Sequence, residues 1–306
     1  MKNQTVYILF LNRLSDLPSL QLPLFLVFLL IYLMTLSGNR LIFFLIIIDS
    51  HLHTPMYFFL GTLACLDMSY SSVTVPRMLF DLLTHKSVIS VAVCITQIYF
   101  FIFFCTSELS VLAVMSCDRY IAICRPLHYM QIMSWKVCVW LLSLISFFST
   151  VNSFLHTIFL SKITFCRSNV LQNFFCDLPQ FLQVSCSDTF INVLFIFLSL
   201  FGVGPLGVTL YPYFPIISTV LKIPSNQVRS KTFSTCSSHL TVVFIFYSTA
   251  FFNYFRSYAN DHYAEDKVAS IFYAVLTPVL NPLIYSLRNQ ELKSSLKRVL
   301  QRLQFF

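Results

Sequence analysis

The stretch Leu22–Ile48, LPLFLVFLLIYLMTLSGNRLIFFLIII, decides the fold. It exceeds the roughly 20 apolar residues that a helix needs to cross a bilayer, and its one charged residue is Arg40. Arg40 follows Gly38 and Asn39 and is unusual at this depth, and we expect its long side chain to reach toward the cytoplasmic headgroups. The stretch predicts a membrane-spanning helix.

Six further apolar runs follow, separated by polar or proline-containing breaks, and no soluble domain or internal repeat stands between them. Nothing ahead of the first run resembles a cleavable signal peptide, so we expect the first helix to direct its own insertion. We therefore predict a single all-α membrane domain over residues 1–306, a bundle of seven helices. The predicted spans are 22–48, 56–79, 91–123, 137–160, 189–221, 236–255 and 268–287.

The composition excludes a water-soluble protein. Hydrophobic residues make up 57% of the chain and charged residues only 10%, against about 25% in soluble domains. The net charge of +8 lies mostly on one side of the predicted membrane. With the N-terminus outside, the cytoplasmic segments hold eleven Lys and Arg against three acidic residues, and the outer segments hold eight against seven. The basic balance thus indicates an inner membrane surface and not a nucleic-acid partner.

Two further marks agree with an outside N-terminus. Asn3-Gln4-Thr5 is an N-glycosylation sequon, which is useful only on the lumenal side. The tail 290–303 predicts a basic amphipathic helix on the anionic inner leaflet, although a solvated charged helix is the alternative. Its apolar face consists of Leu292, Leu296, Val299, Leu300 and Leu303.

Four of the ten cysteines fall on the proposed outside, where an oxidising compartment favours disulfides. They allow three pairings that spacing does not separate, and none forms the CxxC spacing of a zinc site, so we predict no structural metal. These cysteines are Cys94, Cys166, Cys176 and Cys186.

Two carboxylates lie inside apolar runs, where an ionisable group is costly. Asp67 and Glu108 stand at similar inferred depth, and Asn281 on the seventh run could join them. The two acids either share a proton or hold a cation such as sodium, because desolvated like charges disfavour each other's ionisation. A structural hydrogen-bonded pair is the alternative.

An enzymatic function finds no support in the motifs. The stretch 202–207 matches GxGxxG by letter, but it lies inside an apolar run, contains Pro205 and has no βαβ context. We expect its glycines to let the fifth helix bend or pack closely.

The stretch Met115–Tyr129, MSCDRYIAICRPLHY, resembles the odorant-receptor signature MAYDRYVAICxPLHY, with Cys117 where that family usually has Tyr. Further blocks resemble the same family in the same order, over nearly the whole chain. They are Gly38-Asn39, 52–60 (LHTPMYFFL), 231–240 (KTFSTCSSHL) and 278–289 (PVLNPLIYSLRN).

The resemblance implies a rhodopsin-like (class A) G-protein-coupled receptor in the plasma membrane of olfactory sensory neuron cilia. Such a receptor would bind an odorant and activate the olfactory stimulatory heterotrimeric G protein, raising cyclic AMP. Membrane lipid is its surrounding partner.

The same blocks place a signalling switch near the cytoplasm. Arg119 can pair with Asp118 at rest and be released toward a partner. Pro282 removes a backbone hydrogen bond from its helix and leaves carbonyl groups that Asn281 and water can satisfy. The resemblance gives the switch residues Asp118, Arg119, Tyr120, Tyr213, Lys231, His239, Asn281, Pro282 and Tyr285.

The resemblance also implies disulfides between Cys94 and Cys176 and between Cys166 and Cys186. The chain departs from the family in places. Asn173 replaces a His, which puts any metal role of that position in doubt. Pro212 precedes Tyr213 where the family has Ser, and with Pro215 close behind we expect a kink in the fifth helix.

The predicted ligand pocket lies in the outer half of the bundle and is largely aromatic, as suits a small apolar ligand. The third run carries no acid between Cys94 and Glu108 to bind an amine, and no Lys lies between Ala269 and Leu287 to hold retinal. The ligand class left after these two exclusions is a neutral volatile molecule, which would accept a hydrogen bond from Asn152, Thr106 or Tyr254. About half of the pocket residues could instead fill helix interfaces. The full set of predicted pocket residues is Phe101, Ile102, Cys105, Thr106, Leu109, Asn152, His156, Phe197, Phe201, Tyr247, Phe251, Tyr254, Ile271 and Ala274.

Two other classes of function are weaker. A transporter would show paired inverted repeats and discontinuous helices, and only the fifth run, rich in Gly and containing Pro205, suggests this. A structural or adhesion protein would not need the intracellular blocks, which suit a partner.

Overall fold

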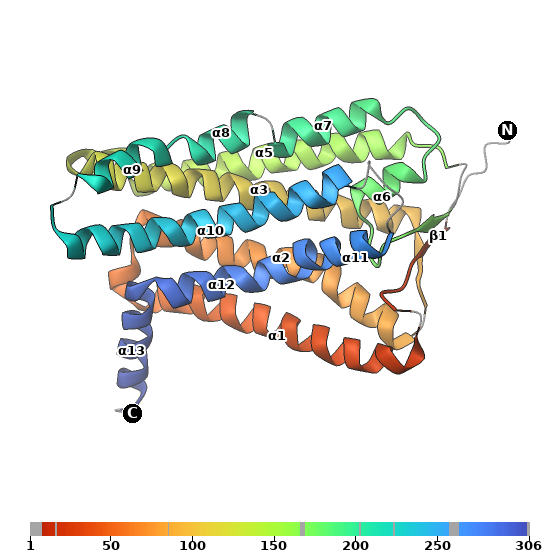
Figure 1. Cartoon of the computed structure of the whole chain (residues 1–306), viewed down its shortest axis with the longest axis horizontal. Helices are drawn as coiled ribbons and strands as arrows, with labels where there is room; N and C mark the ends of the chain where they lie inside the picture. Colours follow the sequence, from red (N-terminus) through yellow and green to blue (C-terminus); the bar gives the residue numbers. More distant parts are fainter. Residues whose placement is uncertain are drawn as a thin grey trace.

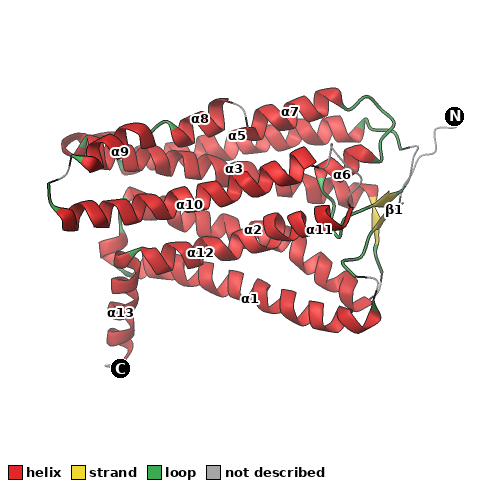
Figure 2. Cartoon of the chain, viewed as in Figure 1, coloured by secondary structure: helices red, strands yellow, loops and turns green. Residues whose placement is uncertain are grey.

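The computed structural model describes residues 8–15, 17–84, 86–165, 169–201, 203–222, 224–256 and 263–304. Long helices run side by side along one axis, and the last helix turns away from that axis (Figure 1). Nearly all of the described chain is helical (Figure 2). We call the end that carries strand β1 (Ile8–Leu11) the outer end, and the end that carries helix α13 (Gln290–Gln304) the inner end.

Each of the first four predicted spans is one continuous helix. They are α1 (Pro18–Ile48), α2 (Pro55–Thr84), α3 (Val91–Cys124) and α5 (Trp135–Ser161). Helix α2 continues five residues beyond the predicted end at Leu79, where Arg77 and Asp81 form an i,i+4 ion pair of 3.0 Å across its last turns. The inner connections are short helical turns, namely η1 (Ser50–Leu52), η2 (Pro126–His128) and α4 (Tyr129–Ile132).

The fifth span is broken into α7 (Phe190–Phe201), α8 (Val203–Leu210) and α9 (Tyr213–Leu221). The kink expected from Pro212 and Pro215 is confirmed between α8 and α9. Neither proline has an N–H for the helix ladder, and the chain turns instead through a hydrogen bond of 3.3 Å from the Phe214 N–H to the Tyr211 carbonyl. Gly202, at the first break, lies outside the described residues.

The last two spans differ from the predicted boundaries. Helix α10 (Asn226–Arg256) begins ten residues before the predicted start at Cys236, because its polar first turns are helical without being apolar. The seventh span consists of α11 (Tyr263–Ile271), a π-helical stretch η3 (Phe272–Leu276) and α12 (Thr277–Arg288). The π stretch ends just before Pro278, whose missing N–H already interrupts the ordinary ladder.

A small sheet at the outer end was not predicted from the sequence. Strand β1 lies between β2 (Val88–Ser90), to which it is antiparallel, and β3 (Val170–Leu171), to which it is parallel. Leu9 and Leu11 point inward from β1, whereas Ile8 and Phe10 are exposed. The sheet therefore joins the N-terminal segment to two outer loops and covers the bundle with apolar side chains.

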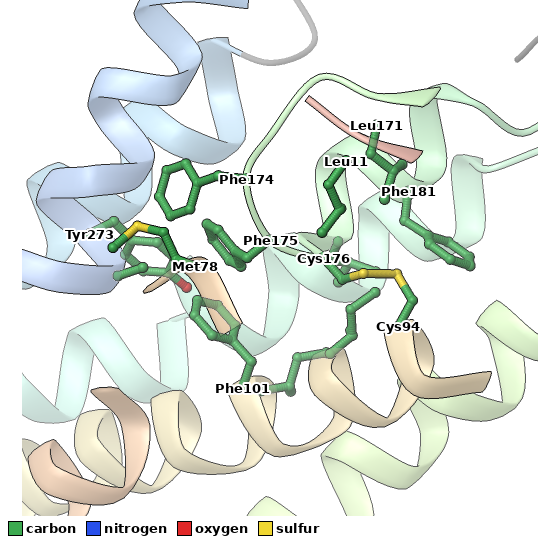
Figure 3. Packing of buried hydrophobic residues seen from close by; sticks show 14 of the residues in the cluster. Leu11, Met78, Cys94, Phe101, Leu171, Phe174, Phe175, Cys176, Phe181 and Tyr273 are labelled. Carbon is green, nitrogen blue, oxygen red and sulfur yellow. A yellow bond between two sulfur atoms is a disulfide. The ribbon is translucent and has the colours of Figure 1, made fainter. Parts of the chain in front are cut away.

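Beneath the sheet the largest buried cluster fills the outer half of the bundle (Figure 3). Residues from β1, α2, α3, β3, η3 and the short helix α6 (Leu178–Gln183) converge there. The disulfide between Cys94 at the start of α3 and Cys176 in the outer loop lies at the edge of this cluster. It attaches to α3 the outer loop whose Phe174 and Phe175 belong to this cluster.

Five of the described helical segments are long and apolar enough to cross a membrane: α1, α2, α3, α5 and the stretch Lys267–Ser286. The broken fifth span and the apolar part of α10, Cys236–Phe252, are shorter by that measure. These exceptions are the helices with the internal proline breaks and the polar inner extension.

Candidate functional site

Two buried carboxylates meet at the centre of the bundle, as predicted. The side-chain amide nitrogen of Asn281 in α12 donates hydrogen bonds of 2.9 Å to Asp67 in α2 and of 2.9 Å to Glu108 in α3. All three side chains are almost completely buried. One amide thus bridges three helices. The second oxygen of Asp67 has no hydrogen-bond partner within the described part of the chain.

The predicted pocket residues on α3 and on the seventh span lie together. Phe101, Ile102, Cys105, Leu109 and Ala274 belong to the buried outer cluster, and Tyr247 and Ile271 pack against it. Their inward positions follow the helical period on α3. The geometry brings these side chains together, and their contact with a ligand stays a prediction.

Phe101 is the centre of an aromatic group whose other members were missed from the sequence. Its ring centroid lies 4.8 Å from that of Tyr70, 5.6 Å from that of Phe175 and 5.2 Å from that of Tyr273. Figure 3 shows Phe101, Phe175 and Tyr273 turned toward one another. Tyr273 could not be placed from a regular helical period, because the π stretch that contains it shifts the register of the following residues.

The polar members of the predicted pocket differ in what they can still bind. The Thr106 hydroxyl already donates to the carbonyl of Ile102 at 2.7 Å, within its own helix. The amide nitrogen of Asn152 on α5 is buried and has no hydrogen-bond partner among the described residues. His156, one turn further along α5, packs its ring 4.6 Å from that of Phe195. Asn152 is therefore the better donor for a ligand.

Four predicted pocket residues are not gathered into this cluster. Phe197 and Phe251 are 43% and 47% exposed, so their side chains lie at an accessible surface and outside the packed group. The side chains of Phe201 and Tyr254 lie outside the described part of the structure.

At the inner end of α3, the Asp118 carboxylate accepts hydrogen bonds from two residues. The Arg119 guanidinium pairs with it, the Nε donating at 3.0 Å, and the Tyr129 hydroxyl donates to its other oxygen at 2.8 Å. The Asp118 side chain is fully buried. The neighbouring Tyr120 is half-buried and packs against α9 residues. Tyr129 was in the recognised signature but was not predicted to take part.

A second contact joins the first residue of α9 to α10. The Tyr213 hydroxyl hydrogen-bonds Nδ1 of His239. A cavity of about 10 Å³, roughly one water molecule in size, lies between Arg119, His239 and Tyr285. Of the predicted switch residues, Arg119, His239 and Tyr285 lie around one cavity and Tyr213 contacts His239. Their role in signalling stays a prediction, and the Lys231 side chain lies outside the described part.

The carbonyl freed by Pro282 has a different partner from the one expected. Pro282 has no N–H to donate to the Pro278 carbonyl, and we expected Asn281 or water to do so. Asn281 instead turns to the carboxylates, and Asn39 of α1 donates to the Pro278 carbonyl at 3.1 Å. The Gly38-Asn39 block is therefore an interhelical contact.

Of the two predicted disulfides, Cys94–Cys176 is confirmed. Cys186 is also disulfide-bonded, and its predicted partner Cys166 lies outside the described residues, as does the sequon at Asn3. Asn173, in the position where a His was expected, donates to the Ser270 hydroxyl at 2.8 Å and so ties the outer loop to the seventh span.

The bundle, its disulfide and the converging inner residues define a class of protein. The fold is that of a rhodopsin-like receptor: the crystal structure of squid rhodopsin matches with a TM-score of 0.75 and 18% identity, over 94% of this chain and 87% of that one. The chain belongs to the olfactory receptor family, whose model, described as "Olfactory receptor", matches residues 28–303.

Similar relatives span almost the whole chain. Olfactory receptor 5B12 from Homo sapiens is 46% identical over 97% of this chain and 96% of its own length. Olfactory receptor 1 from Rattus norvegicus is 45% identical with the same coverage, and olfactory receptor 8G50 from Mus musculus is 42% identical over 96% and 95%. The protein is therefore a multi-pass plasma membrane receptor for odorants and not an enzyme.

Proposed function

We propose that this receptor binds small, mostly neutral, hydrophobic volatile molecules in the outer half of its bundle and activates the stimulatory G protein that raises cyclic AMP. One observation carries the ligand class: the buried amide nitrogen of Asn152 has no hydrogen-bond partner among the described residues. It lies on α5, which packs against α3, and the side of α3 that faces the bundle interior carries apolar and aromatic side chains. An apolar molecule with one oxygen suits this combination, because the oxygen accepts from the amide while the hydrocarbon part replaces apolar contacts.

The signalling step follows from the contacts at the inner end. In the described conformation Arg119 is held by Asp118, and α9 is joined to α10 through Tyr213 and His239. We take these contacts as the resting state. Movement of α10 away from α3 separates Tyr213 from His239 and opens the space beside Arg119 to an incoming partner, which then competes with Asp118 for the guanidinium. Ligand favours that state only by binding it more tightly.

A cell assay tests the ligand class and the G protein together. Cells expressing the receptor and the olfactory stimulatory G protein are exposed to alcohols, aldehydes, esters and ketones, and cyclic AMP is measured. Asn152→Leu should raise the half-maximal concentration of an oxygenated ligand about three- to tenfold, the value of one neutral hydrogen bond. Thr106→Val is the matched control, because its hydroxyl already bonds within α3, and it should change the response little.

Two outcomes would overturn the proposal. The first is no response to a broad odorant panel while surface expression is verified. The second is an equal loss of potency in both variants, which would assign Asn152 a merely structural role.

The carboxylate pair completes the proposal with a sodium site. Asp67 and Glu108 are oxygen donors of the kind hard cations prefer, and the buried second oxygen of Asp67 lacks a partner in the described structure. Purified receptor should then unfold at a higher temperature in sodium chloride than in choline chloride, and Asp67→Asn should abolish the difference. A midpoint independent of sodium favours a shared proton instead.

A further inference from the structure

An apolar groove opens on the outside of the bundle near its inner end. It has a volume of about 240 Å³ and lies between α1, α12 and α13. Met34, Gly38 and Leu41 form one wall, Pro282 belongs to the other, and Leu292 and Lys293 close the inner end. Lys293 is the one charged residue among those that line it.

The groove follows from a missing side chain and a fixed helix. A Cβ atom on Gly38 would lie 3.5 Å from Pro282, so the glycine leaves a hollow at the point where α1 and α12 approach each other. Helix α13 is held beneath it, because Arg298 donates to Asp49 at 3.0 and 2.6 Å and Asn289 caps the first turn. The hollow is therefore part of the packed fold.

The lining selects a hydrocarbon chain. Met34 and Leu41 are both 45% exposed, so this wall faces lipid in a chain that spans the membrane. The hydroxyl of Ser286, the other polar residue of the lining, already donates to the Leu283 carbonyl at 3.2 Å. The volume is below the roughly 300 to 1,000 Å³ of a pocket that encloses a compact ligand, and it suits a segment of an elongated chain.

The charge at the inner end selects the headgroup. Lys293 is exposed at the mouth of the groove, and Lys297 stands one turn further on the same face of α13. Arg298 is already paired with Asp49, and Glu291 lies about 200° around the helix from Lys293. Two lysines without a carboxylate on their face fit a phosphate group, and the inner leaflet supplies anionic phospholipids.

We propose that this groove binds one anionic phospholipid of the inner leaflet, with an acyl chain between α1 and α12 and the headgroup phosphate at Lys293 and Lys297. The site depends on the membrane location of the chain and not on which odorant or G protein it uses. Failure of the signalling proposal therefore leaves this one standing, and the reverse also holds.

Photo-crosslinking tests the site in the full-length receptor. Purified protein is mixed with phosphatidylserine that carries a diazirine in one acyl chain, or with phosphatidylcholine carrying the same chain, then irradiated and analysed by peptide mass spectrometry. Crosslinks should fall within residues 34–45 and 279–296, and phosphatidylserine should label these peptides about 20- to 30-fold more than phosphatidylcholine, as expected for roughly fivefold from each of two lysines at a membrane surface.

Two pairs of variants separate the headgroup from the chain. Lys293→Gln should lower phosphatidylserine labelling about fivefold, and adding Lys297→Gln should bring it down to that of phosphatidylcholine. Lys136→Gln, at an exposed inner lysine of α5, should not change it. Leu41→Trp should fill the groove and reduce labelling by both lipids. Leu33→Trp, at a similarly exposed position on another face of α1, should leave labelling unchanged and controls for the added bulk.

Several results would overturn the site. They are crosslinks spread evenly over α1 and α5, equal labelling by the two lipids in the wild type, and labelling unchanged in both Lys293→Gln and Leu41→Trp. Competition by glycerophosphoserine without acyl chains as effective as by the intact lipid would show a free-anion site. Competition by cholesterol alone would show a sterol site.

Discussion

The amide nitrogen of Asn39 in α1 donates to the main-chain carbonyl of Pro278 in α12, at 3.1 Å and out of contact with solvent. In an uninterrupted helix that carbonyl would accept from the N–H of residue 282, which here is a proline. A break in one helix is thus satisfied by a side chain from another. The same amide also donates to the Thr35 carbonyl at 3.0 Å, which fixes its orientation.

A double-mutant cycle tests this dependence. Asn39→Leu keeps the volume and removes the donor, so it should lower the free energy of unfolding by about 1–3 kcal/mol. In a Pro282→Ala background the restored N–H of residue 282 donates to the Pro278 carbonyl. Asn39→Leu should then lower the free energy of unfolding by clearly less. Thermal unfolding in detergent measures both, with Ser37→Ala as the control on α1. Strictly additive effects would show that Asn39 stabilises the bundle in another way.

The inner ion pair predicts a rise in basal signalling. Asp118→Asn removes the charge that holds Arg119, and with 1.5–3 kcal/mol per hydrogen bond to a charged group, ligand-independent cyclic AMP should rise about tenfold or more. Burial, together with the Asp118 carboxylate, raises the pKa of Tyr129, so its hydroxyl keeps the proton that it donates. Tyr129→Phe should therefore raise basal activity in the same direction but less.

Arg119→Ala should abolish the odorant response, because in the proposed mechanism the guanidinium released from Asp118 contacts the G protein. Arg125→Ala, at an exposed arginine six residues on, provides the control for loss of a positive charge. Cyclic AMP is measured at matched surface expression. Normal signalling from Arg119→Ala would remove this residue from the switch.

The outer disulfide predicts a defect in delivery. Cys94→Ser should prevent surface expression, because the loop that carries Phe174 and Phe175 loses its covalent attachment to α3. Cys117→Ser removes a thiol that is free in the structure and should reach the surface normally. Antibody staining of intact cells measures both. Wild-type staining of Cys94→Ser would show that the loop is held well enough by packing alone.

Asp49 predicts how firmly α13 is attached. Its burial raises its pKa, but hydrogen bonds from Arg298 and His51 outweigh this and hold the pKa below the ordinary value. The stabilisation of α13 by the ionised Asp49 carboxylate is therefore fully present above about pH 3.9, the ordinary pKa of Asp, and is lost as the pH falls below that value. At pH 7, Asp49→Asn should speed amide hydrogen exchange in residues 290–304. Asp188→Asn, which keeps a capping oxygen at the outer end, should not.

The sequence predicted features that depend on local pattern. Apolar runs located the spans, and the shared depth of Asp67, Glu108 and Asn281 correctly predicted their contact, because straight helices preserve depth. It missed what depends on distant partners or altered helical register. The π stretch at Tyr273 changes which residues face inward, and the Asn39 contact joins segments 239 residues apart. The polar first turns of α10 are helical yet carry no apolar signal.

The central position of β1 in the outer sheet sets an order of assembly. Phe10 pairs with Val88 on one side and with Val170 on the other, so its two partners are synthesised after the second and the fourth span. Strand β1 must therefore wait on the lumenal side, without a partner until two helices have been inserted and without its second partner until four have been. A completed sheet thus records correct insertion of the first half of the chain, and a quality-control factor that binds unpaired strands could distinguish finished receptors from unfinished ones at this one place.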